Sequence, residues 1–409
     1  MPELKGMAYL KAKLAAKQTR VLTRYRYYEM KNMVRDFGIS TPPDLKFLTA
    51  TLGWCAKAVD SLADRLIYRT FENDLFDMAA IYDANNGDIL IDDGILSALI
   101  SSCSFVYISP NADGYPRLQV IDGGNATGII DPITSLLYEG YAVLEADADG
   151  NVISEAWFTP DFTEYHVKGR APYRADNPAP WPLLVPIINR PDARRPFGRS
   201  RISRSCMSLM QSAARTIKRS EISAEFYSYP QRYAVGLSDD VEISDKWRAA
   251  MSTLLTVTKD DDGDKPALGQ FQQQSMSPHM DHLRMFAAMF AGETGLTMDD
   301  LGFVSDNPSS AEAIKASHEN LRLMARKAQR DFSIGLRNVG YLAACVRDRF
   351  PYAREQISST RVIWEPIFEP DAAMLSGIGD GAIKINQAVP GYFGPGNLRT
   401  LTGIEADQA

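Results

Sequence analysis

The chain has 409 residues, of which 45% are apolar and 23% are charged, and its formal net charge is −7. This composition is typical of a globular protein, and the length allows two or three domains or one large elaborated fold. It excludes a chain that is disordered throughout, and no apolar run approaches the roughly 20 residues of a membrane span. The basic N-terminus lacks a continuous apolar stretch, so we expect no secretory signal.

Four cysteines lie far apart and show no paired spacing: Cys55, Cys103, Cys206 and Cys345. Zinc sites and disulfide frameworks need regularly spaced cysteines. We therefore expect reduced thiols in the core of a protein made in a cytosol.

Charge is strongly segregated along the chain. Residues 1–35 hold nine basic and two acidic side chains, and residues 194–219 hold eight basic and no acidic ones. Residues 72–93 hold seven acids and no base, and residues 145–164 hold six acids and no base. This pattern predicts surfaces of opposite sign, which suit nucleic-acid contact or the docking of one copy's basic face on another's acidic face. Solvated helix faces without a special role are an equal alternative.

The first hundred residues predict helices at 4–36, 44–68, 73–84 and 93–103, because apolar side chains recur there every three or four positions. From residue 105 to about 191, short alternating or β-branched runs stand between Gly, Asp, Asn and Pro, which predicts a small β-rich region. The expected strands are Phe105–Ser109, Leu118–Ile121, Tyr138–Glu145, Val152–Thr159, Thr163–Val167 and Leu183–Ile188.

Three long helical stretches follow, at 200–229, 277–295 and 309–350. The middle of the second is apolar all round, so it must be covered on more than one side. The third begins with a capping box, and its 39 residues from 312 to 350 would span about 58 Å at 1.5 Å per residue. No small domain is wide enough to bury such a helix, which favours the spine of an elongated subunit.

The segment 231–275 joins the first two of these helices and predicts a compact excursion at the tip of a stalk. Its expected parts are a strand at Arg232–Val235, a short helix near 244–255, a turn at 260–264 and a strand at Gly269–Gln274.

Catalytic signatures are weak. His279 and His282 are one helical turn apart but have no acidic or cysteine partner with ligand spacing, and the turn at 260–264 lacks the spacing of a calcium loop. No P-loop, nucleophile elbow or dinucleotide fingerprint occurs. We expect no catalytic residue, no metal and no cofactor. The basic helix at 200–229 favours non-specific contact with phosphates, or pairing with acids of a neighbouring subunit.

Short runs in a fixed order resemble the portal proteins of tailed bacteriophages, in particular the siphophage-type branch. They cover about residues 27 to 390, and their collinear order is more specific than any single run. The runs are Tyr27-Tyr28-Glu29, Gly53-Trp54, Val59-Asp60, Pro186-Ile187-Ile188-Asn189-Arg190-Pro191, Phe197-Gly198-Arg199-Ser200, Ala224-Glu225-Phe226, Pro230-Gln231-Arg232-Tyr233, Gly269-Gln270-Phe271, Ser277-Pro278-His279, Leu301-Gly302-Phe303, Asn307-Pro308-Ser309-Ser310-Ala311-Glu312 and Trp364.

This resemblance implies an α+β, mainly helical, non-enzymatic subunit of a twelve-membered ring at one capsid vertex, through which double-stranded DNA is packaged and ejected. Its implied parts are N-terminal helices and β-rich wing 1–199, stem helices 200–229 and 277–295, clip 230–276, tunnel loop 296–311, long wing helix and return strand 312–370, and crown 371–409. The implied partners are the terminase large subunit, the major capsid and scaffolding proteins and the head–tail adaptor, with no membrane. The protein would be made in the host cytoplasm and end in the virion.

Within that ring, the resemblance implies channel-facing residues in the tunnel loop and basic residues of the stem near the DNA. Because the acids of the loop have no nearby base in the sequence, we expect a lining that repels the duplex rather than gripping it. The alternatives are a nucleic-acid-processing enzyme with a helical accessory domain and a structural adaptor or scaffold that forms no ring. The expected loop residues are Thr297, Met298, Asp299, Asp300, Ser305, Asp306 and Asn307, and the stem residues are Arg215, Lys218 and Arg219.

Overall fold

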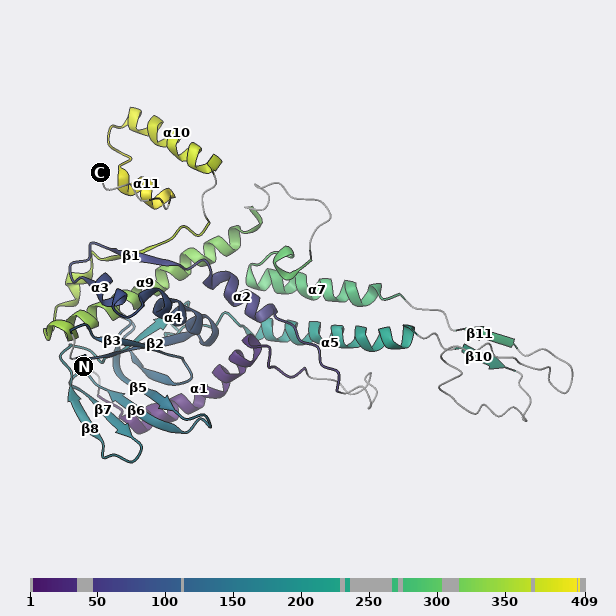
Figure 1. Cartoon of the computed structure of the whole chain (residues 1–409), viewed down its shortest axis with the longest axis horizontal. Coiled ribbons are helices and arrows are strands. Elements are labelled where there is room, and N and C mark those ends of the chain that lie inside the picture. The colour runs from purple at the N-terminus through teal and green to yellow at the C-terminus, as the bar shows by residue number, and fades with distance from the viewer. Residues whose placement is uncertain are drawn as a thin grey trace.

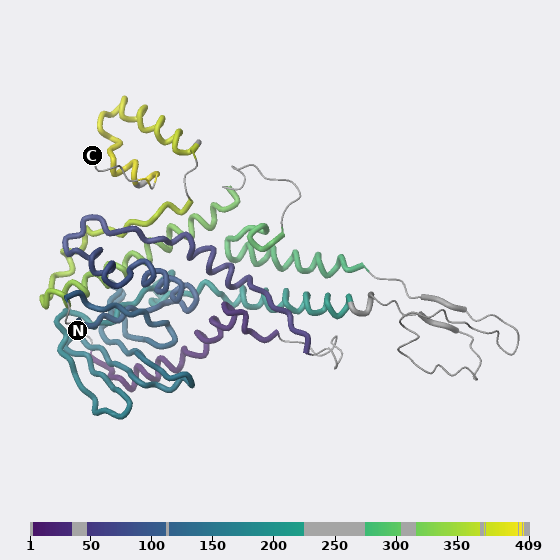
Figure 2. Tube along the Cα trace, in the orientation of Figure 1, coloured from purple at the N-terminus to yellow at the C-terminus, as the bar shows by residue number. Residues whose placement is uncertain are grey.

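The computed structural model describes residues 3–34, 47–111, 114–228, 232–235, 267–270, 275–303, 316–368, 372–402 and 404. Figure 1 shows an elongated molecule with a body of helices and sheets at one end. Two long neighbouring helices project from the body, and a C-terminal helical pair lies beside it. The tube in Figure 2 follows the same path along the chain. The α+β class with long helices is confirmed.

Two antiparallel sheets form layers of the body. The smaller sheet has the order β3-β2-β9, formed by Arg117–Ile121, Cys103–Ser109 and Leu184–Ile188. The larger sheet has the order β4-β5-β6-β7-β8, formed by Ala126–Ile130, Leu137–Ala146, Val152–Phe158, Phe162–Val167 and Tyr173–Asp176. The sheets touch where Leu184 lies against Gly140, since a Cβ at Gly140 would come within 3.0 Å of the Leu184 side chain.

Helices cover the other face of the smaller sheet. Helices α4 (Gly87–Ser101) and α9 (Glu319–Asp348) lie on the sheet, and α2 (Trp54–Ala63) and α3 (Met78–Asp83) pack against these two helices. Ser104 of β2 donates to the Gly94 carbonyl of α4 at 2.6 Å, and its register partner Ile187 lies against Gly335 of α9. With both faces covered, β2 is buried along nearly its whole length, and its sequence is an almost continuous apolar run.

Helix α9 has 30 described residues, or about 45 Å at 1.5 Å per residue. Its C-terminal half is the centre of the core, because nearly every residue from Gly335 to Val346 is buried. The Tyr82 hydroxyl donates to the Leu336 carbonyl at 2.8 Å, inside that core. The expectation that one subunit could not bury this helix is therefore wrong for this half. The capping box expected at its start lies outside the described residues.

The two N-terminal helices are shorter than predicted. Helix α1 spans Met7–Tyr28 rather than 4–36, because the chain turns away at Met30, whose φ of 58° is left-handed. Helix α2 begins at Trp54, and the predicted residues beyond 64 include part of β1 (Tyr68–Glu72). Strand β1 pairs with β12 (Arg361–Trp364), almost 300 residues away in sequence. A distant strand partner overrode the local helical pattern.

The six expected strands of the β-rich region correspond to β2, β3, β5, β6, β7 and β9, each within two residues at either end. Strands β1, β4 and β8 were not predicted, whereas β12 lies in 312–370, where the resemblance implied a return strand without giving its bounds. The two shorter expected helices correspond to α3 and α4 with shifted ends. All four cysteines are free and buried, as expected.

The projecting pair consists of α5 (Arg204–Ser228) and α7 (Ser277–Thr294), which agree with the expected 200–229 and 277–295. Beyond them, β10 (Arg232–Val235) pairs antiparallel with β11 (Ala267–Gln270). The short helix near 244–255 and the turn at 260–264 lie outside the described residues. At the C-terminus, α10 (Ala372–Ala388) and α11 (Pro395–Thr402) form a helical pair.

Arg201, just before α5, joins the projecting pair to the body. Its side chain is buried, and Nε donates to the Ala58 carbonyl of α2 at 3.1 Å, while Nη2 donates to the Thr294 carbonyl of α7. Nη1 lies 3.0 Å from Met324 Sδ of α9. Burial lowers the pKa of this guanidinium to about 10, so the group stays charged at neutral pH. One side chain thus fixes three helices at the base of α5.

We predict that Arg201→Ala lowers the free energy of unfolding by about 3 kcal/mol, because two buried carbonyls lose a charged donor. Urea unfolding of the full chain, followed by circular dichroism, measures this change. Arg117→Ala is the matched control, since Arg117 is exposed, and it should change stability by less than about 0.5 kcal/mol. Equal midpoints for the two variants would contradict the role of Arg201.

Candidate nucleic-acid interface

In the turn after α7, the Asp300 carboxylate bonds to groups of the same chain. The Thr297 N–H and hydroxyl donate to Asp300 Oδ2 at 2.9 and 3.0 Å, and the Asp300 N–H donates to Thr297 Oγ1 at 3.1 Å. This is a reciprocal capping box at the short helix η2 (Asp299–Leu301). His318 Nε2 lies 3.5 Å from the same carboxylate oxygen. Burial raises the pKa of Asp300, but these hydrogen bonds and His318 outweigh burial and leave that pKa below its ordinary value.

Asp300 therefore stabilises the turn, and the expectation that the acids of this loop have no nearby base is wrong for it. Thr297 is half-buried, and Met298 is half-buried and packs against the core. Asp299 is the exposed one of the four expected loop residues that the structure describes. The other expected loop residues, Ser305, Asp306 and Asn307, lie outside the described residues. The structure does not test whether any of them faces a channel.

The expected basic residues of the stem lie together on α5. Arg215, Lys218 and Arg219 are half-buried and fall within five consecutive positions of one helix. Arg215 Nη2 donates to Ser212 Oγ at 2.9 Å. Their charges form one basic band along the stem, which can attract a phosphate backbone without reading its sequence.

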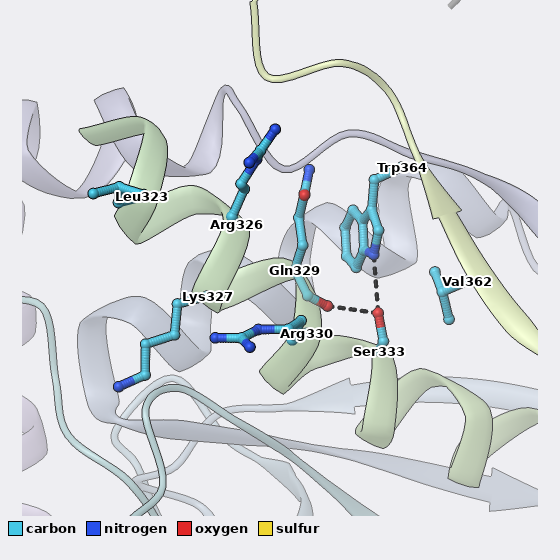
Figure 3. Close-up of a pocket in the computed structure, with 8 residues that line it drawn as sticks. All are labelled: Leu323, Arg326, Lys327, Gln329, Arg330, Ser333, Val362 and Trp364. Atoms are coloured by element: carbon cyan, nitrogen blue, oxygen red, sulfur yellow. Dashed lines mark hydrogen bonds between the residues drawn. The ribbon is translucent and has the colours of Figure 1, made fainter. Parts of the chain in front are cut away.

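A second basic site lies on α9 and was not singled out from the sequence. Arg326, Lys327 and Arg330 line a pocket of about 540 Å³ with Trp364 of β12, and Figure 3 shows their side chains. The Trp364 Nε1–H donates to Ser333 Oγ at 2.9 Å, which fixes the indole at the pocket edge. All three cations are exposed, and no acidic side chain lines this pocket. The available signal was the run of basic residues in 322–330, spaced at helical intervals.

The basic N-terminal segment is partly structural. Lys13 and Lys17 of α1 donate to the carbonyls of Gly128 and Ala126 at 2.6 and 2.7 Å. Burial lowers the pKa of both ammonium groups. Arg24 donates to the Ser101 carbonyl at 2.9 Å. These three cations bind α1 to the body, so this part of the basic segment stabilises the fold.

Metal-binding residues do not converge in the part of the chain that the structure describes. There, no group of three His, Cys, Asp or Glu side chains could hold an ion. His279 Nε2 lies 3.4 Å from Ser223 Oγ on α5, and the His282 ring lies 4.5 Å from the Phe286 ring. Both histidines therefore contact neighbouring stem side chains. Among the described residues, no helix is long and apolar enough to cross a membrane.

We predict that Asp300→Asn destabilises the chain by about 1 kcal/mol at pH 7, because the amide cannot accept all the hydrogen bonds of the carboxylate. The folded-state pKa of Asp300 lies below its unfolded value. The carboxylate's contribution is therefore complete above the unfolded pKa and is lost as the pH falls through the folded pKa. Thermal unfolding between pH 7 and pH 2 measures the difference, with Asp299→Asn as the exposed control. A difference from the parent chain that does not shrink at low pH would contradict this assignment.

Two of the solved structures to which this chain is similar come from gene transfer agent particles. The chain in the virion of the native particle has a TM-score of 0.48 and 14% identity, and the match covers 94% of this chain and 93% of that chain. The chain in the neck of the native particle, computed with C12 symmetry, has a TM-score of 0.45 and 15% identity, covering 94% of this chain and 99% of that chain.

Sequence comparison gives a clearer result. The portal proteins of Mycobacterium phages D29 and L5 are each 26% identical over 329 residues, or 72% of this chain. The matched region spans 65% of the length of each of these relatives. The family model for phage portal proteins of the SPP1 Gp6-like type matches residues 8–371. The chain therefore belongs to the SPP1 Gp6-like family of phage portal proteins.

Proposed function

We propose that this chain is the subunit of a closed ring of twelve copies, which forms a channel for double-stranded DNA at one vertex of a phage capsid. The stem is α5 with α7, the clip follows at 230–276, and the tunnel loop is 296–311. The wing is 1–199 with the long helix and return strand of 312–370, and the crown is 371–409. The clip would meet the terminase large subunit and later the head–tail adaptor, and the wing would meet the capsid and scaffolding proteins.

The observation that carries this proposal, beside the family match, is an apolar face of α7 that the chain leaves open to solvent. Met285 and Met289 lie one turn apart on this face and are 47% and 54% exposed, although α7 packs against α5 on its other side. Ala288 and Gly292 are exposed on the same helix, and such small residues let another helix approach closely. Burying each methionine fully is worth about 1.5–3 kcal/mol. Because these side chains are already about half buried, a neighbouring copy that covers this face would gain about half of that energy for each of them.

The C-terminal helical pair has the same property. Ile383 and Ile385 of α10 are exposed, as are Val389 and Tyr392 in the connection to α11. The Asn386 side chain accepts from the Phe393 N–H at 2.7 Å and donates to the Phe393 carbonyl at 2.9 Å, so the connection is ordered by its own hydrogen bonds. A crown of several copies would cover these apolar side chains.

DNA in such a channel must be held weakly, because the duplex has to slide. The cations of the α9 pocket lie on the helix that follows the tunnel loop in sequence, and the exposed Asp299 lies in the first part of that loop. Attraction from Arg326, Lys327 and Arg330 and repulsion from acids of the loop would act on the same phosphates. The balance is sensitive to salt and independent of base sequence.

Mass photometry and negative-stain imaging of the purified chain test the ring directly. We predict closed rings with a central hole and a mass of about twelve subunits, because the apolar face of α7 gains cover only from another copy. A compact monomer or dimer would favour a nucleic-acid-processing enzyme, and open or irregular assemblies would favour a structural adaptor or scaffold. Either result would contradict the portal role.

Alanine substitution of Arg326, Lys327 and Arg330 together should weaken association of rings with a 100-base-pair duplex. The slope of log affinity against log salt should fall by about one for each side chain that contacts a phosphate. Fluorescence anisotropy across a salt series measures the slope. The matched control replaces three exposed cations of the sheets, Arg117, Lys168 and Arg170, and should leave the slope unchanged. Identical slopes for both triple variants would exclude the α9 pocket as a DNA contact.

A further inference from the structure

A strongly basic pocket lies where α1 meets the base of the stem. Its volume is about 820 Å³, and no acidic side chain lines it. We call it the basic socket. Its cations come from α1, from the loop before α5 and from the start of α5: Lys17, Arg20, Arg24, Arg195, Arg199 and Arg204.

Half of these cations already have partners inside the chain. Lys17 and Arg24 donate to main-chain carbonyls, and Arg199 forms an ion pair with Asp192 at 2.6 Å. The other three, Arg20, Arg195 and Arg204, are exposed, and no described carboxylate forms an ion pair with them. The socket therefore concentrates positive charge that its own chain does not neutralise.

The pKa of the Arg24 guanidinium reflects this excess charge. Burial is the main cause that lowers the pKa of its guanidinium, and repulsion from Arg20 and Arg195 lowers it further. An anionic group between these side chains would remove the repulsion. A planar guanidinium pairs especially well with a carboxylate, because it can donate two parallel hydrogen bonds.

The same chain carries a matching acidic face, formed by Asp64 at the end of α2 and by Asp88, Asp92 and Asp93 of α4. All four side chains are exposed, and no described cation forms an ion pair with them. Partial burial raises the pKa of Asp92, and repulsion from the other three raises it further. This face, like the basic socket, collects charges of one sign.

One copy cannot bring the two surfaces together. Helix α4 connects them, because Ser101 at its C-terminal end lines the basic socket while the acids stand near its N-terminal end. From Asp92 to Ser101 the helix rises about 13.5 Å at 1.5 Å per residue. That exceeds the screening length of about 10 Å at 0.1 M salt. The rigid helix keeps the surfaces apart, so each needs a partner from outside its own chain.

We propose that the acidic face of one copy docks in the basic socket of the next copy. The contact is heterologous, since the two surfaces differ, and repeated around an axis it closes a ring. The closing of the ring rests on the proposed portal function. The contact between two copies does not depend on it. It accounts for a chain of net charge −7 that nevertheless gathers six cations in one pocket.

The position of the socket disfavours a nucleic acid as its occupant. In Figure 1, α1 meets the stem on the side of α5 that faces away from α7. The described start of the connection from α7 to α9, which includes η2, lies on the α7 side of the stem. A duplex threaded past that connection would have the stem between itself and the socket. A protein surface rich in carboxylates therefore fits this location better.

The test reverses one surface at a time in the full chain. A socket variant carries Arg20→Glu, Arg195→Glu and Arg204→Glu, and a face variant carries Asp88→Lys, Asp92→Lys and Asp93→Lys. All six side chains are exposed, so both variants should fold, which circular dichroism checks. In mass photometry at 0.1 M salt, each variant alone should need at least about tenfold more protein than the parent chain to assemble.

An equimolar mixture of the two variants should recover assembly, because the reversed socket of one then meets the reversed face of the other. The control reverses Arg117, Lys168 and Arg170 to Glu, which gives the same charge change as the socket variant, and it should assemble like the parent chain. Assembly of both variants at the parental concentration, or no recovery in the mixture, would overturn the contact and leave the ring proposal standing. A parent chain that stays monomeric would overturn both. A socket variant that assembles normally but loses duplex binding would assign the socket to a nucleic acid instead.

Discussion

The burial of one arginine without a carboxylate sets the geometry of this subunit. Arg201 donates to the Thr294 carbonyl, which belongs to the last turn of α7, where main-chain carbonyls lack helical partners and carry the negative end of the helix dipole. The charge is thus balanced by backbone rather than by a side chain. Because the same guanidinium also donates to Ala58 of α2, the stem cannot tilt against the body without breaking a buried, charged hydrogen bond. In a symmetric ring that tilt decides whether neighbouring copies meet at the angle that closes the circle.

The long helices could be predicted closely because local chemistry marks their ends. Helix α7 begins beside Pro278 and ends at Gly295, whose φ of 70° suits glycine. The helix at 44–68 was predicted too long because its C-terminal boundary depends on a distant partner. The segment after α2 has a helical pattern, but Tyr68 and its neighbours pair with a strand near residue 364. Strands of four or five residues with partners so far away leave almost no periodic signal.

The candidate site could also be predicted only in part. The sequence alone indicated which residues of the tunnel loop and the stem to consider. It did not indicate which side chains of the folded chain surround them. The capping box of Thr297 and Asp300 is local, whereas His318 reaches the same carboxylate only through the fold. The basic run on α9 was visible as sequence, yet charge runs are usually solvated faces, and only Trp364 of a distant strand makes it a pocket. The role of the basic N-terminal segment could not be predicted from its charge alone, since three of its cations bind backbone carbonyls of the body.

The apolar face of the stem and the charged surfaces of the body would contribute differently to an assembly. Apolar contact is strong but non-directional, so the exposed methionines of α7 would accept a neighbour in several registers. The basic socket and the acidic face are held apart by the rigid helix α4, so a contact between them is directional, and like charges that meet in a wrong register repel. A ring with a defined number of subunits needs both properties, because affinity without register yields open aggregates. The segregation of charge along the sequence is then explained by geometry: a head-to-tail contact requires one face of each sign on every copy.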